Sequence, residues 1–325
     1  MQKILIIRFS SIGDIVLTSP LLRAIKQQKP NMEVHYLSKK SFASVLENNP
    51  HIDRLILLDN NIQETIKLLM KEKYDHIIDL HKNLRTFRIK KCLKVPASSF
   101  EKLNWEKWLL VKFNINNLPK THIVQRYFKT LENLGVKDDG KGLEYYSGLE
   151  SQTEINGLPS KMVNNFAVIV IGGTYYTKQI PLEKLLELIQ TISIPVVLLG
   201  GPSDKSLAQD VVKKSAKQVI SSVGKSSLNE SAEILRRSQF VVSGDTGLMH
   251  IAAAYQKKIF SVWGNTVPSF GMTPYMPDKP DLSVIIENNE LSCRPCSKLG
   301  FEKCPKEHFN CMMGLDFSVI NKEFK

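Results

Sequence analysis

Short apolar runs alternate with amphipathic segments along both halves of the chain, and this alternation restricts the fold more than any other feature. We predict strands over residues 3–9, 33–37, 54–58 and 76–80 in the first half, and over 166–171, 196–199, 218–221, 239–243 and 258–263 in the second. Helices are expected over residues 14–28 and 62–73, with a further helix ending over 46–50. Strands and helices in this order are typical of parallel, doubly wound α/β sheets.

A stretch without strong periodicity, residues 140–160, separates the two halves and contains several Gly, Ser and Glu residues. We therefore expect two Rossmann-like domains, residues 1–155 and 156–325, facing across a cleft. In sheets of this kind, ligands bind beyond the carboxyl ends of the strands. The last residues, 315–325, are expected to form a helix.

Hydropathy and cysteine content indicate the compartment. No apolar run approaches the roughly 20 residues that a helix needs to span a bilayer. The N-terminal residues carry a charge at Arg8 and lack the apolar region and cleavage site of a signal peptide. We therefore expect a cytoplasmic protein whose five cysteines are reduced or metal-bound.

The formal net charge of +12, from 44 Lys and Arg against 32 Asp and Glu, favours an anionic partner. Nucleic acid, a membrane surface and a phosphorylated substrate all satisfy this condition, and composition does not choose among them. The charge is spread widely, which argues against a dedicated nucleic-acid groove.

A strand-to-helix turn in the second half is the first candidate binding element. Ser243-Gly-Asp-Thr-Gly joins a strand to a helix predicted over residues 248–255, and Asp245 or Thr246 can cap that helix. Free backbone N–H groups at such a turn form a natural seat for phosphate. Taken alone, an ordinary capped turn is an equally good interpretation, and a helical histidine such as His250 is more often packed than ligand-binding.

Two further turns follow the first and second strands of the second half. Gly172-Gly173-Thr174 leads to Lys178, and this glycine-rich loop with a lysine suits phosphate, although a solvated lysine is the alternative. Ser203 and Asp204 follow Leu199-Gly-Gly-Pro and could meet a ribose or cap a helix. In the first half, Asp14 follows the first strand and is either a helix cap or a general base at the cleft.

A basic run follows the strand over residues 76–80. It contains Lys82, Arg85, Arg88, Lys90, Lys91 and Lys94 and no acidic residue. Residues 85, 88 and 91 would share one helix face. Such runs are usually solvated, but this one lies at the mouth of the expected cleft, where an anion could bind.

Four cysteines cluster near the C-terminus: Cys293, Cys296, Cys304 and Cys311, with His308 among them. The first pair has the spacing of half a zinc site, but the second pair is too widely spaced for a standard knuckle. A structural zinc site and reduced thiols packed under a loop both remain open, with the thiols favoured. A disulfide is least expected.

Together, the motifs resemble glycosyltransferase family 9, the ADP-heptose:lipopolysaccharide heptosyltransferase family, in the family's order. The segments that carry the resemblance are residues 8–16, 79–85, 199–202 and 244–250. The resemblance implies a GT-B fold with the donor nucleotide-sugar on the C-terminal domain and the acceptor on the N-terminal one. It also implies inverting transfer of heptose from ADP-heptose to the Kdo/heptose inner core of a lipid A acceptor, with no metal or cofactor required.

Residue roles follow from the same resemblance. Asp14 matches the catalytic base, and the other matching residues divide between two ligands. The donor-binding set is Thr174, Lys178, Ser203, Asp204, Asp245, Thr246, Gly247 and His250, and the acceptor-binding set is Ser11, Gly13, Lys82 and Arg85. The family's better-studied members have a Glu near the ribose where this chain has Ser203 and Asp204. The expected partners are an ADP-sugar and an anionic lipid A/Kdo acceptor at the inner face of the cytoplasmic membrane, where the protein would be peripheral, and no nucleic acid.

The competing hypothesis is a non-catalytic protein that binds nucleotides or nucleic acid. It would use the positive charge and the anion-binding turns without needing Asp14. Metal-dependent sugar transfer is not indicated, because the chain contains no Asp-x-Asp after a strand.

Overall fold

A computed structural model describes residues 2–58, 61–150, 152, 154, 155, 158, 159, 162 and 164–323. The chain divides into two compact units. Unit 1 contains Met1–Lys102 and Thr121–Gly148, and unit 2 contains Leu103–Lys120 and Leu149–Lys325. The predicted boundary between residues 155 and 156 adjoins residue 156, which lies outside the described residues, so that boundary stays a prediction. The sequence did not predict that residues 103–120 belong to the second unit.

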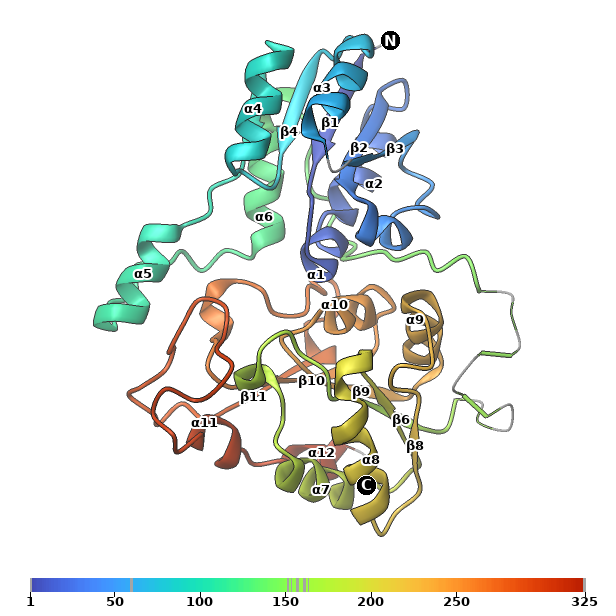
Figure 1. Cartoon of the computed structure of the whole chain (residues 1–325), viewed down its shortest axis with the longest axis vertical. Helices are drawn as coiled ribbons and strands as arrows, with labels where there is room; N and C mark the ends of the chain where they lie inside the picture. Colours follow the sequence, from blue (N-terminus) through green and yellow to red (C-terminus); the bar gives the residue numbers. More distant parts are fainter. Residues whose placement is uncertain are drawn as a thin grey trace. The chain divides into compact units, whose positions relative to one another are not determined.

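Unit 1 is built on a five-stranded sheet with the order β3-β2-β1-β4-β5, in which every pairing is parallel (Figure 1). The strands are β1 (Lys3–Ile7), β2 (Glu33–Lys39), β3 (Arg54–Leu58), β4 (His76–Asp79) and β5 (Ala97–Ser99). The helices are α1 (Ile12–Val16), α2 (Ser19–Gln28), α3 (Ile62–Lys71), α4 (Leu84–Leu93) and α6 (Ile123–Phe128), with 3₁₀ turns at Lys40–Val45 and Lys129–Leu134.

The central strand of unit 1 is buried on both faces. Leu5 and Ile7 join a core cluster with Ile66 and Leu69 of α3 and Ile89 of α4. The intervening residues of β1 are buried as well. Because successive side chains of a strand point to opposite faces, this sheet is covered on both sides, as parallel sheets require.

Unit 2 is built on a six-stranded parallel sheet with the order β11-β10-β9-β6-β7-β8. The strands are β6 (Ala167–Val170), β7 (Val196–Leu199), β8 (Val219–Ser221), β9 (Phe240–Gly244), β10 (Lys258–Trp263) and β11 (Ser283–Glu287). The helices are α5 (Asn104–Phe113), α7 (Leu182–Thr191), α8 (Lys205–Lys214), α9 (Leu228–Arg237), α10 (Gly247–Ala254), α11 (Asn310–Met313) and α12 (Ser318–Glu323), with 3₁₀ turns at Tyr176–Lys178, Pro202–Asp204, Pro268–Phe270 and Pro280–Leu282.

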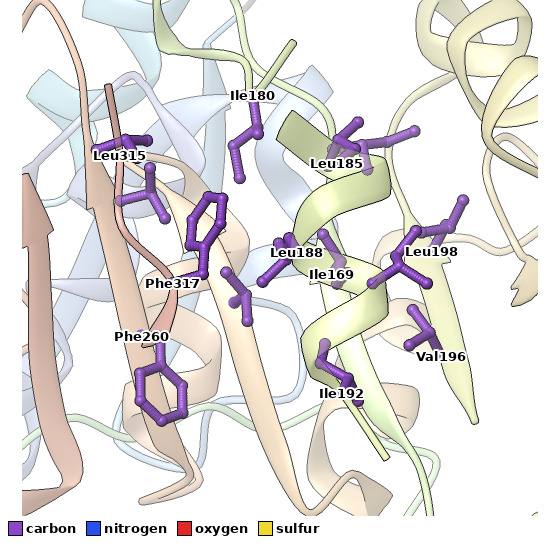
Figure 2. Packing of buried hydrophobic residues seen from close by; sticks show 14 of the residues in the cluster. Ile169, Ile180, Leu185, Leu188, Ile192, Val196, Leu198, Phe260, Leu315 and Phe317 are labelled. Carbon is purple, nitrogen blue, oxygen red and sulfur yellow. The ribbon is translucent and has the colours of Figure 1, made fainter. Parts of the chain in front are cut away.

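The end of the chain packs into the core of unit 2. Figure 2 shows Phe317 between α7 and β10, near Leu188 of α7. The ammonium of Lys184 donates to the Leu315 carbonyl at 2.8 Å and lies over the Phe317 ring. The predicted terminal helix exists as the shorter α12, and its docking site is the sheet face that α7 also covers.

The sequence predictions were wrong for two helices and missed two strands. The helix predicted over residues 14–28 is divided into α1 and α2, because it is interrupted at Thr18, whose hydroxyl donates to the Ile15 carbonyl at 2.7 Å. No α-helix ends over residues 46–50; a 3₁₀ turn precedes them. The strands β5 and β11 were also missed: β5 has only three residues at a sheet edge and gives no apolar run, whereas β11 has five residues. None of the helices in the described ranges is both long and apolar enough to cross a membrane.

Strand order locates the expected binding edge of each sheet. In unit 1 the chain adds β2 and β3 on one side of β1 and then adds β4 and β5 on the other side, so the order of the strands reverses between β1 and β4. In unit 2 the same reversal occurs between β6 and β9. Ligands of doubly wound sheets bind beyond the carboxyl ends of the strands at such switch points. The segments after β1, β4, β6 and β9 are therefore the ones to examine.

Candidate active site

The loop after β1 holds Asp14 in an ion pair. Arg8 Nη2 lies 2.7 Å from Asp14 Oδ1, and the guanidinium also donates to the Ser10 carbonyl at 2.8 Å and to the Leu80 carbonyl. Asp14 Oδ2 accepts from the Ser11 backbone N–H at 3.1 Å and from the Ser11 hydroxyl at 2.8 Å. Asp14 thus caps the first turn of α1, and it is also a half-buried carboxylate at the switch point of the sheet.

Burial and charge act on Asp14 in opposite directions. Burial tends to raise the pKa of the Asp14 carboxyl, but the Arg8 charge and the hydrogen bonds from Ser11 outweigh it and lower the pKa below its ordinary value. The carboxylate is therefore ionised at neutral pH and able to accept a proton.

Asp79 organises the turn after β4. Its buried Oδ1 accepts from the backbone N–H groups of His81 and Lys82 at 3.1 and 2.7 Å, and Oδ2 lies 2.8 Å from Lys90 Nζ. Lys82 adopts the left-handed conformation, with φ of 48°, and Asn83 then caps α4. The sequence-predicted acceptor residues Lys82 and Arg85 are both exposed here, next to the switch point.

His81 and Lys102 are two further residues of this edge, and no role was predicted for either of them. Burial, with the charges of Arg8 and Lys102, lowers the pKa of His81 to about 4, so its imidazole is neutral at pH 7. Its ring lies 4.9 Å from that of Phe9, and the buried Nδ1 has no hydrogen-bond partner among the described residues. Burial also lowers the pKa of Lys102. Only the position of His81, two residues after the end of β4, could have indicated it.

In unit 2, the structure brings together Lys178 and Asp245 from the two switch-point strands. Lys178 follows β6 and Asp245 follows β9, and Lys178 Nζ lies 2.6 Å from Asp245 Oδ2. The Thr266 hydroxyl, which follows β10, donates to the same oxygen at 3.4 Å. Asp245 thus holds the lysine at the carboxyl edge of the sheet.

The turn between β9 and α10 exposes the start of a helix, as predicted. Thr246 is its N-cap, since its hydroxyl accepts from the Met249 N–H at 3.4 Å. The alternative of Asp245 as the cap is wrong, because Asp245 pairs with Lys178 instead. Gly244 is required here, since a Cβ would lie 2.7 Å from the Lys178 carbonyl oxygen. The Met249 N–H is thus taken by the cap, and the N–H groups of Gly247 and Leu248, in the first turn of α10, have no acceptor within the helix and could face an anion.

The Asp204 carboxylate accepts hydrogen bonds from groups of unit 2. Its carboxylate accepts from the Gly201 N–H at 2.8 Å and from the Gln179 side chain at 3.3 Å. A Cβ on Gly172 would lie 2.5 Å from Asp204 Oδ2, so the glycine allows the carboxylate to pack against this turn. Ser203, by contrast, is exposed. Of the two residues predicted for the ribose, Ser203 is therefore the accessible one.

Three other residues near this edge differ in accessibility. Thr174 is exposed, and His250 is buried within α10. Asn265, after β10, has a buried side-chain amide with neither its nitrogen nor its oxygen bonded within the described structure. A buried, unsatisfied amide in a native protein calls for an explanation such as a ligand or water. Sequence reasoning missed Asn265 because no motif marks it.

The C-terminal cysteines do not form a metal site in the described residues. No three Cys, His, Asp or Glu side chains converge among the described residues as metal ligands, and Cys293 Sγ lies 4.0 Å from His308 Nε2. The Cys296 thiol donates to the Cys293 carbonyl. Burial raises the pKa of Cys296 to about 12 and that of Cys311 to about 11, so these groups are protonated thiols. The arrangement is that of packed, reduced thiols.

Comparison with known proteins identifies the family. The sequence profile of glycosyltransferase family 9 (heptosyltransferase) matches residues 62–301. The chain belongs to glycosyltransferase family 9. Lipooligosaccharide heptosyltransferase 2 of Haemophilus influenzae is 25% identical over 92% of this chain and 93% of its own length. Lipopolysaccharide heptosyltransferase 3 of Escherichia coli K12 is 24% identical over 78% of this chain and 80% of its own length.

Solved structures show the same fold. E. coli heptosyltransferase WaaC with ADP has a TM-score of 0.69 at 22% identity and covers 99% of both chains. A family 9 glycosyltransferase from Veillonella parvula has a TM-score of 0.67 at 24% identity and covers 84% of both chains. The predicted family and its GT-B fold, two doubly wound units, are thus confirmed.

Proposed function

We propose that this family 9 glycosyltransferase transfers heptose from ADP-heptose to the inner core of lipopolysaccharide, with inversion and without a cofactor. The observation that carries the proposal is the placement of the motif residues. The candidate base lies at the switch point of one sheet and the candidate phosphate-binding lysine at the switch point of the other. The alternative of a non-catalytic nucleotide or nucleic-acid binder is not favoured, since the chain belongs to a family of transferases.

On the acceptor side, Asp14 acts as the general base. Its ionised carboxylate accepts the proton of the acceptor hydroxyl as that oxygen attacks the anomeric carbon of the donor sugar. Arg8 and Ser11 hold the carboxylate in place. Lys82 and Arg85, exposed after β4, attract the phosphates and carboxylates of the acceptor.

On the donor side, the bond between the anomeric carbon and the diphosphate oxygen breaks, and negative charge grows on the departing ADP. Lys178 and the N–H groups that begin α10 stabilise this charge, as preorganised donors do in other transfer reactions. Thr174, Ser203 and Asn265 lie on loops of the same sheet edge, where the ribose and phosphates of the donor would bind.

Asp14→Asn tests the assignment. General-base catalysis contributes typically about 10²–10⁴-fold, and we expect transfer to fall by nearly that whole factor. Affinity for the ADP-sugar, measured by calorimetric titration, should barely change, because the asparagine keeps the size of the side chain. The matched control is Asp139→Asn, which removes another ion-paired carboxylate of unit 1, paired with Arg23. Wild-type turnover of Asp14→Asn at saturating acceptor would leave Asp14 as a helix cap only.

A further inference from the structure

The loop after β10 is held by a short segment that follows β11. Four consecutive carbonyl oxygens of this loop accept hydrogen bonds from residues 294–296: those of Trp263, Gly264, Asn265 and Thr266. The Arg294 guanidinium donates three of these bonds, and the Cys296 backbone N–H donates the fourth at 3.1 Å. Residues 264–266 are buried and lie beyond the end of β10, where the sheet no longer pairs the backbone. Because buried carbonyls need donors, residues 294–296 supply what the sheet does not.

Arg294 uses its whole guanidinium in this part of the structure. Its side chain is only 4% exposed, and its other bonds go to the Asn288 carbonyl and to Glu287, whose Oε2 lies 2.9 Å from Nη2. A guanidinium has five N–H donors in a planar fork, whereas the ammonium of a lysine is a point charge with three. A lysine at position 294 would therefore keep the charge beside Glu287 but would lose most of the bonds to the loop.

A few residues further on, the chain contacts the loop after β6. The Phe301 N–H donates to the Thr177 hydroxyl at 2.8 Å, and the Phe301 carbonyl accepts from the Thr177 N–H at 3.2 Å. Gly300, with φ of 140°, packs directly against Tyr175, since a Cβ on this glycine would lie 2.5 Å from the Tyr175 Cβ. Residues 294–301, the bridging segment, thus contact the loop after β10 at one end and the loop after β6 at the other. Lys178 directly follows the part of the β6 loop that they contact.

We propose that Arg294 is a positioning residue of the donor site, and that the bridging segment fixes the two loops in the arrangement that the site needs. Asp245 joins the loops, because its Oδ2 lies 2.6 Å from Lys178 Nζ and accepts from the Thr266 hydroxyl at 3.4 Å. The position of the Lys178 ammonium therefore depends on both loops. Arg294 acts through Thr266 and Asp245. The proposal rests on the proposed function in one respect, which is that Lys178 stabilises the departing diphosphate.

Arg294→Lys is the first test, because it retains the charge and removes the planar fork. Misplacing a reacting group by about 1 Å can cost about 100-fold in rate, and we expect kcat for transfer from ADP-heptose to fall by about that factor. KM for the acceptor should not change, because the proposed acceptor-binding residues belong to unit 1. Loss of charge alone cannot produce this result.

A double variant distinguishes positioning from a general loss of stability. In the Lys178→Ala background, Arg294→Lys should lower kcat by less than about threefold more, because residues that act through one another are not additive. The matched control is Lys184→Met, which removes another buried cation of unit 2 and its bond to the Leu315 carbonyl. The control should lower the melting temperature and leave kcat at the wild-type value.

Hydrogen exchange tests the ordering of the loops without any transfer. The backbone amides of residues 175–178 and 264–266 should exchange faster in Arg294→Lys than in the wild-type protein, and those of α7 should not. Thr177→Val is a second variant for the other end of the bridging segment. It keeps the shape of the side chain but removes the hydroxyl that bonds Phe301, and kcat should fall about tenfold, the effect of one or two neutral hydrogen bonds.

Three results would overturn the proposal: wild-type kcat in folded Arg294→Lys, a further 100-fold loss when this change is added to Lys178→Ala, and an equal loss of kcat in Lys184→Met at an equal melting temperature. If Arg294→Lys does not fold, Thr177→Val decides, and wild-type kcat in that variant would equally overturn the proposal. Absence of transfer in the wild-type protein, or wild-type kcat in Lys178→Ala, would instead count against the proposed function. The exchange rates of the two loops would then show whether Arg294 orders them.

Discussion

Replacing Lys178 by alanine probes the donor site most directly. Its Nζ lies 2.6 Å from Asp245 Oδ2, and both side chains are largely buried. Removing one preorganised group that stabilises a developing negative charge typically lowers kcat by about 10²–10³, or roughly 2.7–4 kcal/mol. We expect a loss at the upper end of this range for Lys178→Ala. The change also leaves the Asp245 carboxylate without its counter-ion, next to where the diphosphate of the donor would depart.

A double variant separates these two contributions. Lys178→Ala/Asp245→Asn removes the uncompensated carboxylate as well, so it should recover part of the activity that Lys178→Ala loses. Coupling between residues in contact is typically about 0.5–3 kcal/mol, and we expect a value in that range here.

The assay is release of ADP at saturating acceptor, with kcat/KM for the donor compared among the wild-type protein, the two single variants and the double variant. Lys213→Ala, an exposed lysine of α8, controls for loss of charge alone. A wild-type kcat/KM for Lys178→Ala would refute the proposal that Lys178 stabilises the charge of the departing ADP. Strictly additive losses in the double variant would refute the coupling.

Three further predictions concern the acceptor side and the cysteines. Arg8→Gln should move the acid limb of the kcat/KM–pH profile to higher pH, because the Arg8 charge helps to lower the pKa of the Asp14 carboxyl. The ionised Asp14 carboxylate also contributes to folding stability, and this contribution is present above pH 3.8 and is lost as pH falls through the lowered pKa. A profile unchanged from wild type would mean that Asp14 is not the titrating base. Lys82→Ala/Arg85→Ala should weaken acceptor binding far more than donor binding in titrations, and equal losses would instead indicate damage to the fold. Freshly reduced protein should contain close to no zinc by metal analysis, whereas about one zinc ion per chain would restore the structural-zinc interpretation of the four C-terminal cysteines.

Most of the fold could be predicted because the central strands are apolar and buried on both faces. The runs that became β1, β6 and β10 are visible in the sequence for that reason. Of the four edge strands, β3 and β8 were predicted and β5 and β11 were missed. The strand β5 has three residues, none of them fully buried, and such strands depend on the neighbour that they pair with. That residues 103–120 belong to unit 2 could not be predicted from the sequence either, because tertiary contacts alone decide it.

The site divides in the same way. Motifs indicated Asp14, Lys178 and Thr246, since a turn after a strand needs particular residue types to build it. The partners were not indicated. Nothing in the sequence shows that Asp245 holds Lys178 rather than capping α10, or that the amide of Asn265 is buried, because these depend on which loops meet at one edge of the sheet.

Asp14 and Lys178, the two residues proposed to act in the reaction, are held in the same way: each is paired with a side chain of opposite charge. A charged group removed from water is costly unless an opposite charge compensates it. A site that keeps a carboxylate or an ammonium in position before the ligand arrives therefore needs a counter-charge from the chain itself. Arg8 supplies it to Asp14 from the end of the same strand, and Asp245 supplies it to Lys178 from the neighbouring one. Strand order limits the choice to the few loops at each switch point, so topology predicts where the counter-charge lies even where sequence does not name it.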